Sequence, residues 1–177
     1  MRFFHISDLH FGKLLYGYDL TEEHRNFIEQ LGDYCDKYNP DAVLIAGDVY
    51  DRSVPSADAM TLLDELLNKL SGRKVFIISG NHDNAKRLSF GKDFLKKHDI
   101  YISTVPQTGE NEKIEKVTYA DEYGNVNIYM LPFLKPALFK NSMPEEAAAG
   151  EDAIIKKLVE NTDIDKNETV SYTHLTL

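Results

Sequence analysis

The sequence predicts an α/β protein built on a parallel sheet. Short apolar runs alternate with amphipathic helical patterns along the first hundred residues. Two of these runs, AVLIA at 42–46 and KVFIIS at 74–79, are almost continuously apolar, as expected of strands buried on both faces. Strands that alternate with helices pair in parallel through right-handed crossovers, and this order therefore favours the α/β class.

The first half of the chain follows a strand–helix–strand–helix–strand order. The apolar run at 2–7 predicts the first strand. Thr21 is expected to cap a helix that ends at Asn39-Pro40. Ser56 is expected to cap a second helix, whose leucines over 62–70 form one stripe before Ser71-Gly72. The strands at 42–46 and 74–79 complete the order.

The second half is less regular. A basic helix is expected over 89–97 and a short strand over 100–103. The segments 113–119 and 126–131 predict a hairpin, because residues typical of turns separate them. One further helix is expected over 151–160.

Polar side chains follow each of the three strands of the first half. The first strand ends in Asp8-Leu9-His10, the second in Gly47-Asp48-Val49-Tyr50-Asp51, and the third in Gly80-Asn81-His82-Asp83. Parallel strands end at the same edge of a sheet, where such folds bind ligands, so we expect these side chains to converge. Asp8 and His10 are two residues apart and would point the same way in an extended segment.

The residue types indicate a metal site for phosphate chemistry. Carboxylates, an imidazole and an amide oxygen suit Mn²⁺, Mg²⁺, Fe or Zn²⁺. Two ions about 3.5–4 Å apart stabilise both the attacking and the leaving oxygen of a phosphoryl displacement. We expect Asp48, on the middle strand, to bridge two ions, and His82 to stabilise the transition state or protonate the leaving oxygen. Each motif alone also fits a solvated loop, and the three in order favour a site.

Composition excludes several other classes. The chain has 20 Lys and Arg against 29 Asp and Glu, a net charge of −9, which argues against a protein that coats nucleic acid by charge alone. The single cysteine, Cys35, excludes an internal disulfide and a Cys-rich zinc site, and it is expected in the core. No apolar run approaches the roughly 18 residues of a membrane span, and the first residues do not resemble a signal peptide. We therefore expect a cytoplasmic protein.

The three motifs, D-x-H, G-D-x-x-D and G-N-H-D, resemble those of the calcineurin-like metallophosphoesterase superfamily. Their surroundings are similar to the bacterial SbcD-type exonucleases over residues 1–169. The segments that carry this resemblance are 4–13, 46–55, 78–84 and 129–136. It implies the calcineurin-like fold, a layered β-sheet core flanked by helices and here incomplete at the C-terminus.

The resemblance also implies roles for individual residues. The metal ligands would be Asp8 and His10 for one ion, Asp48 for both and Asn81 for the second. His82 would be the catalytic imidazole and Asp83 its orienting partner. Asp51 is given no catalytic role, because some archaeal and eukaryotic relatives carry a histidine there.

The implied activity is a nuclease that depends on two divalent ions, most simply Mn²⁺ with Mg²⁺ as the alternative, and that processes DNA ends and hairpins. Such proteins act as dimers with an SbcC-like coiled-coil ATPase. The chain has no G-x4-G-K-S/T motif, so ATP hydrolysis would belong to that partner. A metallophosphatase or cyclic-nucleotide phosphodiesterase on the same scaffold, and a non-catalytic binding scaffold, remain as alternatives.

The sequence departs from this pattern towards its end. Two later histidine motifs of the family, A-H-Q and G-H-x-H, do not occur in it. The residues Val170–Leu175 look like a translated sequencing adapter. We therefore expect an incomplete nuclease domain over 1–169, a non-native tail over 170–177 that contains His174 by coincidence, and weak metal binding or inactivity of this fragment.

Several remaining residues have simpler interpretations. His5 is expected to be packed in its strand and His24 to be exposed on its helix. Five basic residues follow the third motif and either contact DNA phosphates or form a solvated helix face: Lys86, Arg87, Lys92, Lys96 and Lys97.

Overall fold

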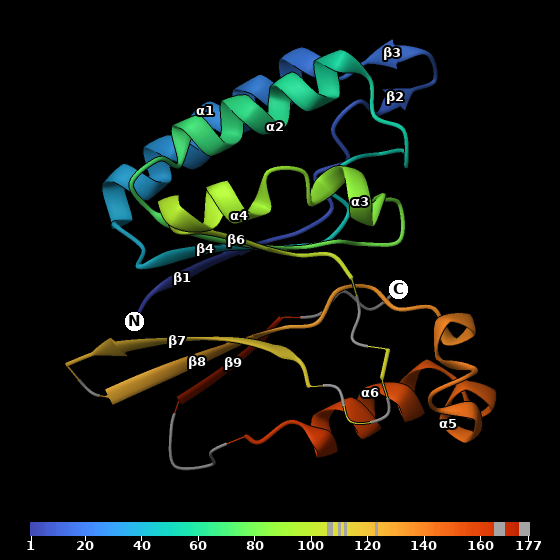
Figure 1. The fold of residues 1–177 in the computed structure, drawn as a ribbon. Helices are drawn as coiled ribbons and strands as arrows, with labels where there is room; N and C mark the ends of the chain where they lie inside the picture. The colour runs from blue at the N-terminus through green and yellow to red at the C-terminus, as the bar shows by residue number, and fades with distance from the viewer. Residues whose placement is uncertain (106–107, 110, 112, 123, 165–168, 174–177) are drawn as a thin grey trace.

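A four-stranded parallel sheet with the order β1-β4-β5-β6 forms the centre of the computed structural model (Figure 1). The structure describes residues 1–105, 108–109, 111, 113–122, 124–164 and 169–173. The strands of this sheet are β1 (Phe3–Ile6), β4 (Ala42–Ala46), β5 (Lys74–Ile78) and β6 (Ile100–Ser103). Every residue of β4 is buried, as its continuous apolar run predicts.

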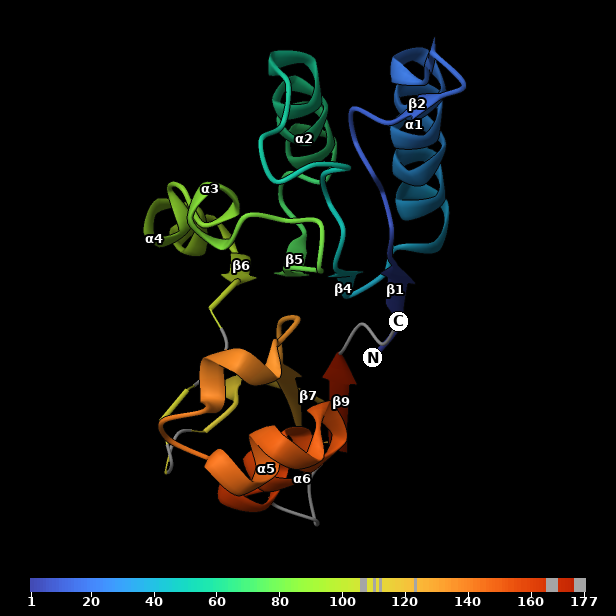
Figure 2. The same ribbon diagram turned by 90° about the vertical axis from the view of Figure 1, so that its right-hand side faces the viewer.

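Two long helices, α1 (Thr21–Tyr38) and α2 (Ala57–Lys69), cover one face of this sheet (Figures 1 and 2). The core between the helices and the sheet includes Ile28, Leu31, Cys35, Val43, Ile45, Leu62, Leu66 and Ile77. The short helices α3 (Ala85–Leu88) and α4 (Lys92–Leu95) and the 3-10 turn η1 (Lys96–His98) lie over β6 (Figure 2). The strand–helix alternation and the parallel sheet are therefore confirmed.

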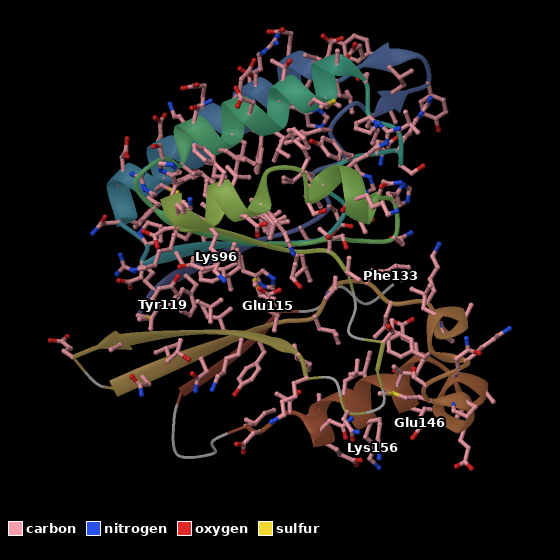
Figure 3. All side chains as sticks on the ribbon, viewed as in Figure 1. Lys96, Glu115, Tyr119, Phe133, Glu146 and Lys156 are labelled. Atoms are coloured by element: carbon pink, nitrogen blue, oxygen red, sulfur yellow. The ribbon has the colours of Figure 1, made fainter. Side chains whose placement is uncertain are left out.

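A second sheet packs against the other face of the first. Its strands, in the order β7-β8-β9, are β7 (Glu115–Asp121), β8 (Gly124–Met130) and β9 (Thr169–Thr173). The core between the sheets contains Ala42, Leu44, Ala46, Phe76, Ile78, Ile128 and Met130. Tyr119 lies in this space with its ring 5.7 Å from that of Phe76 (Figure 3).

The helices α5 (Pro144–Ala149) and α6 (Glu151–Asn161) and the turn η2 (Pro136–Phe139) cover the outer face of the second sheet (Figure 1). The layers thus run helix, sheet, sheet, helix, which is the layered core that the family resemblance implies. The expected hairpin is confirmed with shifted bounds, since β7 and β8 pair from Glu115↔Met130 to Asp121↔Gly124. Helix α5 is an addition that the sequence pattern does not predict.

The start of α1 differs from its prediction. Thr21 is the first residue of the helix and does not cap it. Instead, a carboxylate oxygen of Asp19 accepts hydrogen bonds from the Thr21 amide at 2.8 Å and from the Thr21 hydroxyl at 2.6 Å. The expected cap of α2 is confirmed, because Ser56 Oγ accepts from the Ala59 amide.

The expected basic helix over 89–97 is wrong as a continuous element. Asn84 caps a separate one-turn helix, α3, which ends before Ser89. Gly91 then takes a left-handed conformation, with φ +74°, and starts α4. A helix cannot continue through a residue in that conformation, so the basic residues are spread over two short helices and a 3-10 turn.

Three single-residue expectations have different outcomes. Cys35 is buried, as expected, and burial raises the pKa of its thiol. His5 is exposed and not packed, because β1 is the edge strand of its sheet. His24 is half-buried and not exposed, because its ring packs edge-on against Phe11 at 5.2 Å.

Of the segment expected to be a non-native tail, residues 170–173 belong to β9, which runs parallel to β8. Residues 174–177, with His174, lie outside the described residues. In the part of the chain that the structure describes, no helix combines the length and apolar character needed to cross a bilayer.

The register of the first sheet places the three motifs at one edge. Ile6 pairs with Ile45, and Ile45 pairs with Ile77. The three strands therefore end level with one another, and the segments that follow them begin side by side.

Candidate metal centre

The segments after β1 and β4 continue side by side beyond their strands. The Asp8 amide donates to the Gly47 carbonyl at 3.1 Å, and the His10 amide donates to the Asp48 carbonyl at 2.9 Å. The Phe11 amide donates to the Val49 carbonyl, also at 2.9 Å. These hydrogen bonds hold the D-x-H and G-D-x-x-D motifs against each other.

Three of the expected ligand residues have left-handed backbones. The φ angles are +57° at Asp8, +47° at His10 and +49° at Asp48. Non-glycine residues adopt this region at a cost of about 1–2 kcal/mol each, and such strain is common at functional sites. The side chains of Asp8 and His10 therefore meet through two left-handed turns, and not through the extended segment that the sequence suggests.

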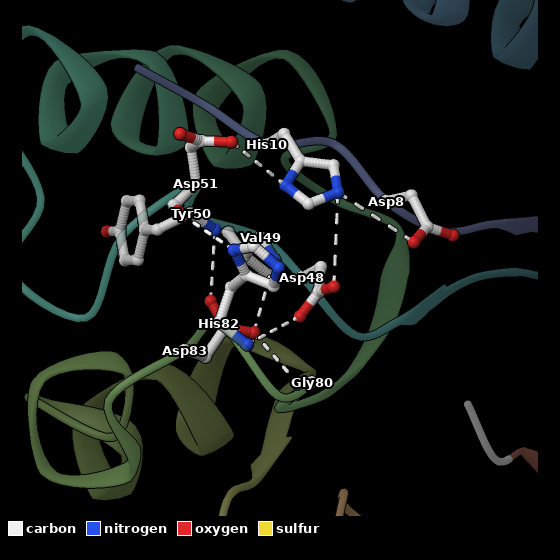
Figure 4. Close-up of polar contacts among 9 residues, drawn as sticks. All are labelled: Asp8, His10, Asp48, Val49, Tyr50, Asp51, Gly80, His82 and Asp83. Carbon is white, nitrogen blue, oxygen red and sulfur yellow. Dashed lines mark hydrogen bonds and ion pairs between the residues drawn. The ribbon is translucent and has the colours of Figure 1, made fainter. Parts of the chain in front are cut away.

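The side chains of these residues surround one point at the sheet edge (Figure 4). His10 Nε2 lies 3.9 Å from Asp8 Oδ1 and 3.9 Å from Asp48 Oδ2. One imidazole nitrogen and two carboxylate oxygens that each lie about 2.1 Å from one ion are separated by about 3–4 Å. This spacing and these donor types fit a divalent cation.

Asp51, to which the sequence gives no role, is part of the same cluster. Its carboxylate Oδ1 lies 3.3 Å from His10 Nδ1, on the opposite side of the ring from Asp8 and Asp48 (Figure 4). His10, Asp51 and His82 form a second group with possible ligand atoms close together. The signal that could have found it is its place as the last residue of G-D-x-x-D, three positions after Asp48.

His82 lies at the exposed side of the centre. Its Nδ1 lies 2.8 Å from the carbonyl oxygen of Asp51, and its backbone amide donates to Asp48 Oδ1 at 2.9 Å. The His10 and His82 rings are perpendicular, with centroids 5.0 Å apart. The carbonyl favours a proton on Nδ1, so Nε2 accepts a proton when the ring is neutral and donates one only from the imidazolium.

The expectation that Asp83 orients His82 is wrong in this structure, because the carboxylate of Asp83 has other partners. It accepts hydrogen bonds from the backbone amides of Val49 at 3.1 Å, Tyr50 at 2.9 Å and Gly80 at 2.9 Å. Asp83 thus joins the segments after β4 and β5, and the Asp51 carbonyl takes the position beside His82. Burial raises the pKa of Asp83, and the three amide donors oppose that shift.

Gly80 allows the two segments to approach closely. A Cβ atom at this position would lie 2.1 Å from Asp48 Oδ1 and 2.4 Å from the Asp48 amide nitrogen. No side chain fits in that space, so glycine is required for the carboxylate of Asp48 to reach the amide of His82.

Asn81 is the remaining expected ligand. Its side-chain oxygen is buried and, among the described residues, has no hydrogen-bond partner. A buried polar atom without a partner is costly unless another group satisfies it. An amide oxygen is a good ligand for Mn²⁺ or Mg²⁺, so this atom fits a role as a metal ligand.

The basic residues after the third motif extend away from the metal centre. Lys86 and Arg87 lie on α3, Lys92 lies on α4, and Lys96 and Lys97 lie on η1. Lys86 and Arg87 line a groove beside α2, whereas Lys92 and Lys96 lie beside Asp93 and Glu115. This placement is compatible with both expected roles, a contact with DNA phosphates and a solvated surface.

Two comparisons with known proteins agree with this geometry. The family model described as calcineurin-like phosphoesterase matches residues 1–173. The SbcD subunit of the nuclease SbcCD from Staphylococcus epidermidis (strain ATCC 12228 / FDA PCI 1200) is 30% identical over 183 aligned residues, which cover 100% of this chain and 47% of the relative. The chain therefore spans about half the length of this curated relative.

Proposed function

The chain belongs to the calcineurin-like phosphoesterase family, and from this premise we propose that it is the nuclease region of an SbcD-type protein. The family implies hydrolysis of phosphate esters with divalent metal ions. The finer proposal is hydrolysis of DNA phosphodiesters at ends and hairpins, in repair or recombination in the cytoplasm. Its support is the 30% identity to the SbcD subunit of an SbcCD nuclease.

The observation that carries the proposal is the convergence of the three strand ends. Imidazole Nε2 of His10 lies 3.9 Å from a carboxylate oxygen of each of two aspartates, Asp8 and Asp48, and the rings of His10 and His82 are in contact distance. The side-chain oxygen of Asn81 is buried and has no hydrogen-bond partner in the part of the chain that the structure describes. A cluster of salt bridges would not require such an atom, whereas a metal site would use it.

We assign metal binding to Asp8, His10, Asp48 and Asn81. Bound divalent ions, for which we propose Mn²⁺ with Mg²⁺ as the alternative, would polarise the phosphate and lower the pKa of a water molecule. Asp48 has one carboxylate oxygen towards His10 and the other on the His82 amide, so it connects both sides of the centre.

The role of His82 follows from its two contacts. The Asp51 carbonyl holds Nδ1, and the Asp48 carboxylate holds the backbone amide, so Nε2 is the ring nitrogen that we assign to proton transfer. Once Nε2 has taken up a proton, the resulting imidazolium would donate that proton to the leaving oxygen. Asp83 supports this arrangement indirectly, by holding the segments after β4 and β5 together.

The proposed partners are DNA, an SbcC-like coiled-coil ATPase and a second copy of the chain. For the second copy we propose the apolar groove of about 640 Å³ between α2 and the 88–95 segment. Its wall includes the exposed side chains of Met60, Phe90 and Phe94. Burial of three large apolar side chains would stabilise a dimer.

The test is cleavage of a DNA hairpin and of a small phosphate monoester by the product of the whole genomic reading frame, with and without Mn²⁺. Mn²⁺-dependent cleavage of the hairpin that is lost in Asp48→Asn and His82→Ala is the expected result. Hydrolysis of the monoester without hairpin cleavage would favour the metallophosphatase alternative. Failure to bind Mn²⁺ in a titration would favour the non-catalytic scaffold.

The 177-residue chain provides a second measurement. Binding of Mn²⁺ to it can be followed by the loss of the free-ion paramagnetic resonance signal. We expect this binding to weaken in Asp8→Asn and to be unchanged in Asp36→Asn, an exposed aspartate on α1.

A further inference from the structure

A two-stranded hairpin follows the first motif and lies beside the start of α1 (Figure 1). Its strands are β2 (Leu14–Leu15) and β3 (Tyr18–Asp19), and it begins four residues after His10 (Figure 1). Its large apolar side chains are exposed, with Leu14 and Leu15 at 50%, Tyr18 at 62% and Tyr16 at 103%. These side chains do not build a core, so packing does not explain them.

The turn of this hairpin holds a tyrosine in a strained, left-handed backbone conformation. Leu15 and Tyr18 are paired, so the loop has two residues, Tyr16 with φ +52° and Gly17 with φ +86°. Positive φ at both positions is typical of a type I′ turn, in which Asn, Asp or Gly is favoured at the first position. A fully exposed tyrosine gains no packing that would offset this strain, and strain of this kind points to a function.

A pocket of about 470 Å³ lies between the hairpin and the segment that leads into α2. Its apolar walls come from Leu14, Val54 and Pro55. Phe11 and Arg52, which also line it, directly follow His10 and Asp51 of the metal centre in the chain. A volume of this size is ordinary for a small-molecule site.

The charged side chains of the pocket indicate whether it suits the base or the phosphate of a nucleotide. Asp19 and Asp58 line it and would repel a phosphate. Asp58, and the oxygen of Asp19 that does not accept from Thr21, would instead accept hydrogen bonds from the amino groups of a base. Arg52 also lines the pocket and directly follows Asp51 in the chain. Its Nε lies 3.9 Å from Oδ2 of Asp51, whose other carboxylate oxygen faces His10 of the metal centre. The pocket thus suits a base, with its phosphate towards Arg52 and the metal centre.

We propose that the β2–β3 hairpin and this pocket hold an unpaired base next to the scissile phosphate, and that Tyr16 stacks on the following base. The proposal rests on the proposed nuclease function and assigns it a preference for frayed or single-stranded DNA over paired DNA. A flat aromatic ring on a protruding turn is the usual form of a stacking platform.

The test compares binding of two DNA probes in metal-free buffer, where cleavage does not interfere. One probe carries 2-aminopurine in an unpaired overhang, and the other is the same duplex with a blunt, fully paired end. The variants are Tyr16→Gly and Tyr16→Asn, which remove the ring and suit the turn. The control is Tyr34→Ala, an exposed tyrosine near the other end of α1.

The expected result is at least about fivefold weaker binding of the overhang by both Tyr16 variants, as for one lost stacking contact. The blunt duplex and the Tyr34→Ala variant should bind as before, and the thermal midpoint of Tyr16→Gly should rise because strain is removed. Unchanged binding of the overhang, or an equal loss for both probes, would overturn the proposal. A loss of ATPase-partner binding with DNA binding unchanged would also overturn it, in favour of a protein-docking hairpin.

Failure of this inference is distinguishable from failure of the proposed function. Mn²⁺-dependent hydrolysis of bis(4-nitrophenyl) phosphate by the unmodified genomic product reports the chemistry of the metal centre without DNA contacts. If this hydrolysis is present while the Tyr16 variants bind the overhang normally, only the hairpin proposal fails. If it is absent, the nuclease proposal fails.

Discussion

Replacing Asp83 with alanine should unfold the molecule more readily, and by an amount that the structure allows us to estimate. The carboxylate accepts three backbone amides, from Val49, Tyr50 and Gly80. A hydrogen bond to a charged group contributes about 1.5–3 kcal/mol, so the three would sum to about 4.5–9 kcal/mol. The burial that raises the pKa of Asp83 offsets part of this sum, because alanine has no charge to desolvate.

We therefore expect Asp83→Ala to lower the free energy of unfolding by about 3 kcal/mol, a large part of the roughly 5–15 kcal/mol that stabilises a typical domain. With a urea m-value of about 2 kcal/mol per molar, the midpoint should fall by about 1.5 M. Urea titration of the metal-free protein, followed by circular dichroism, measures it.

The matched control is His82→Ala, the exposed neighbour in the same motif. It removes one side-chain contact at the surface and should change the free energy of unfolding by less than about 1 kcal/mol, while it removes activity. A loss of less than about 1 kcal/mol for Asp83→Ala would refute our view of this carboxylate as the connection between the two segments. It would return Asp83 to the role of a partner of His82.

Three further predictions concern single residues. Gly80→Ala would place a Cβ atom 2.1 Å from Asp48 Oδ1, so it should lower the free energy of unfolding by about 3 kcal/mol and remove most of the Mn²⁺ affinity. In the control Gly72→Ala the new Cβ meets nothing within 4 Å, and the loss should be only about 1 kcal/mol. Similar losses for the two variants in thermal melts would contradict this. Asp51→Ala should weaken Mn²⁺ binding about 10- to 100-fold in calorimetry, because the His10 ring loses the carboxylate beside Nδ1. Asp51→Asn should weaken it less. Equal Mn²⁺ affinities of Asp51→Ala and the unmodified protein would refute the role of this contact. Burial lowers the pKa of His24 below 6.5, so the folded state favours the neutral ring. The stability that this gives above pH 6.5 should be lost as the pH falls towards the lowered pKa. Urea midpoints of His24→Phe should lack this decrease, and parallel pH profiles of the two proteins would refute the prediction.

The sequence could predict the sheet and the meeting of the three motifs because one physical rule governs both. Strands such as 42–46 are apolar throughout, so they are central, and central parallel strands end at the same edge. The convergence of Asp8, His10 and Asp48 follows from this rule, without any knowledge of the loops.

The details of the loops could not be predicted, because they depend on contacts between residues distant in sequence. Asp83 accepts hydrogen bonds from three backbone amides, and two of the donors, Val49 and Tyr50, lie more than thirty positions away in sequence. The position of Asp51 beside His10 depends on backbone angles that no residue type specifies. For Asp83, the neighbour in sequence, His82, was a misleading guide to the neighbours in space.

The broken helix after the third motif shows a second limit of prediction from sequence. The residues 89–97 have the composition of one helix, and Gly91 was compatible with it at a modest cost. The structure uses the freedom of that glycine to turn the chain, so that Leu88 and Leu95 both reach the core over β6. Tertiary packing here outweighs local preference.

The left-handed backbones at the metal centre have a consequence for how such a site changes over generations. Asp and Asn are the non-glycine residues that accept this conformation most readily, and Asp is also a ligand for hard metal ions. At Asp8 and Asp48, therefore, a single codon determines both the course of the chain and the donor atom. A step from Asp to Asn would keep the course of the chain while it weakens the donor. Lineages that lose catalysis can thus retain the scaffold, and later recover the activity by one reversal.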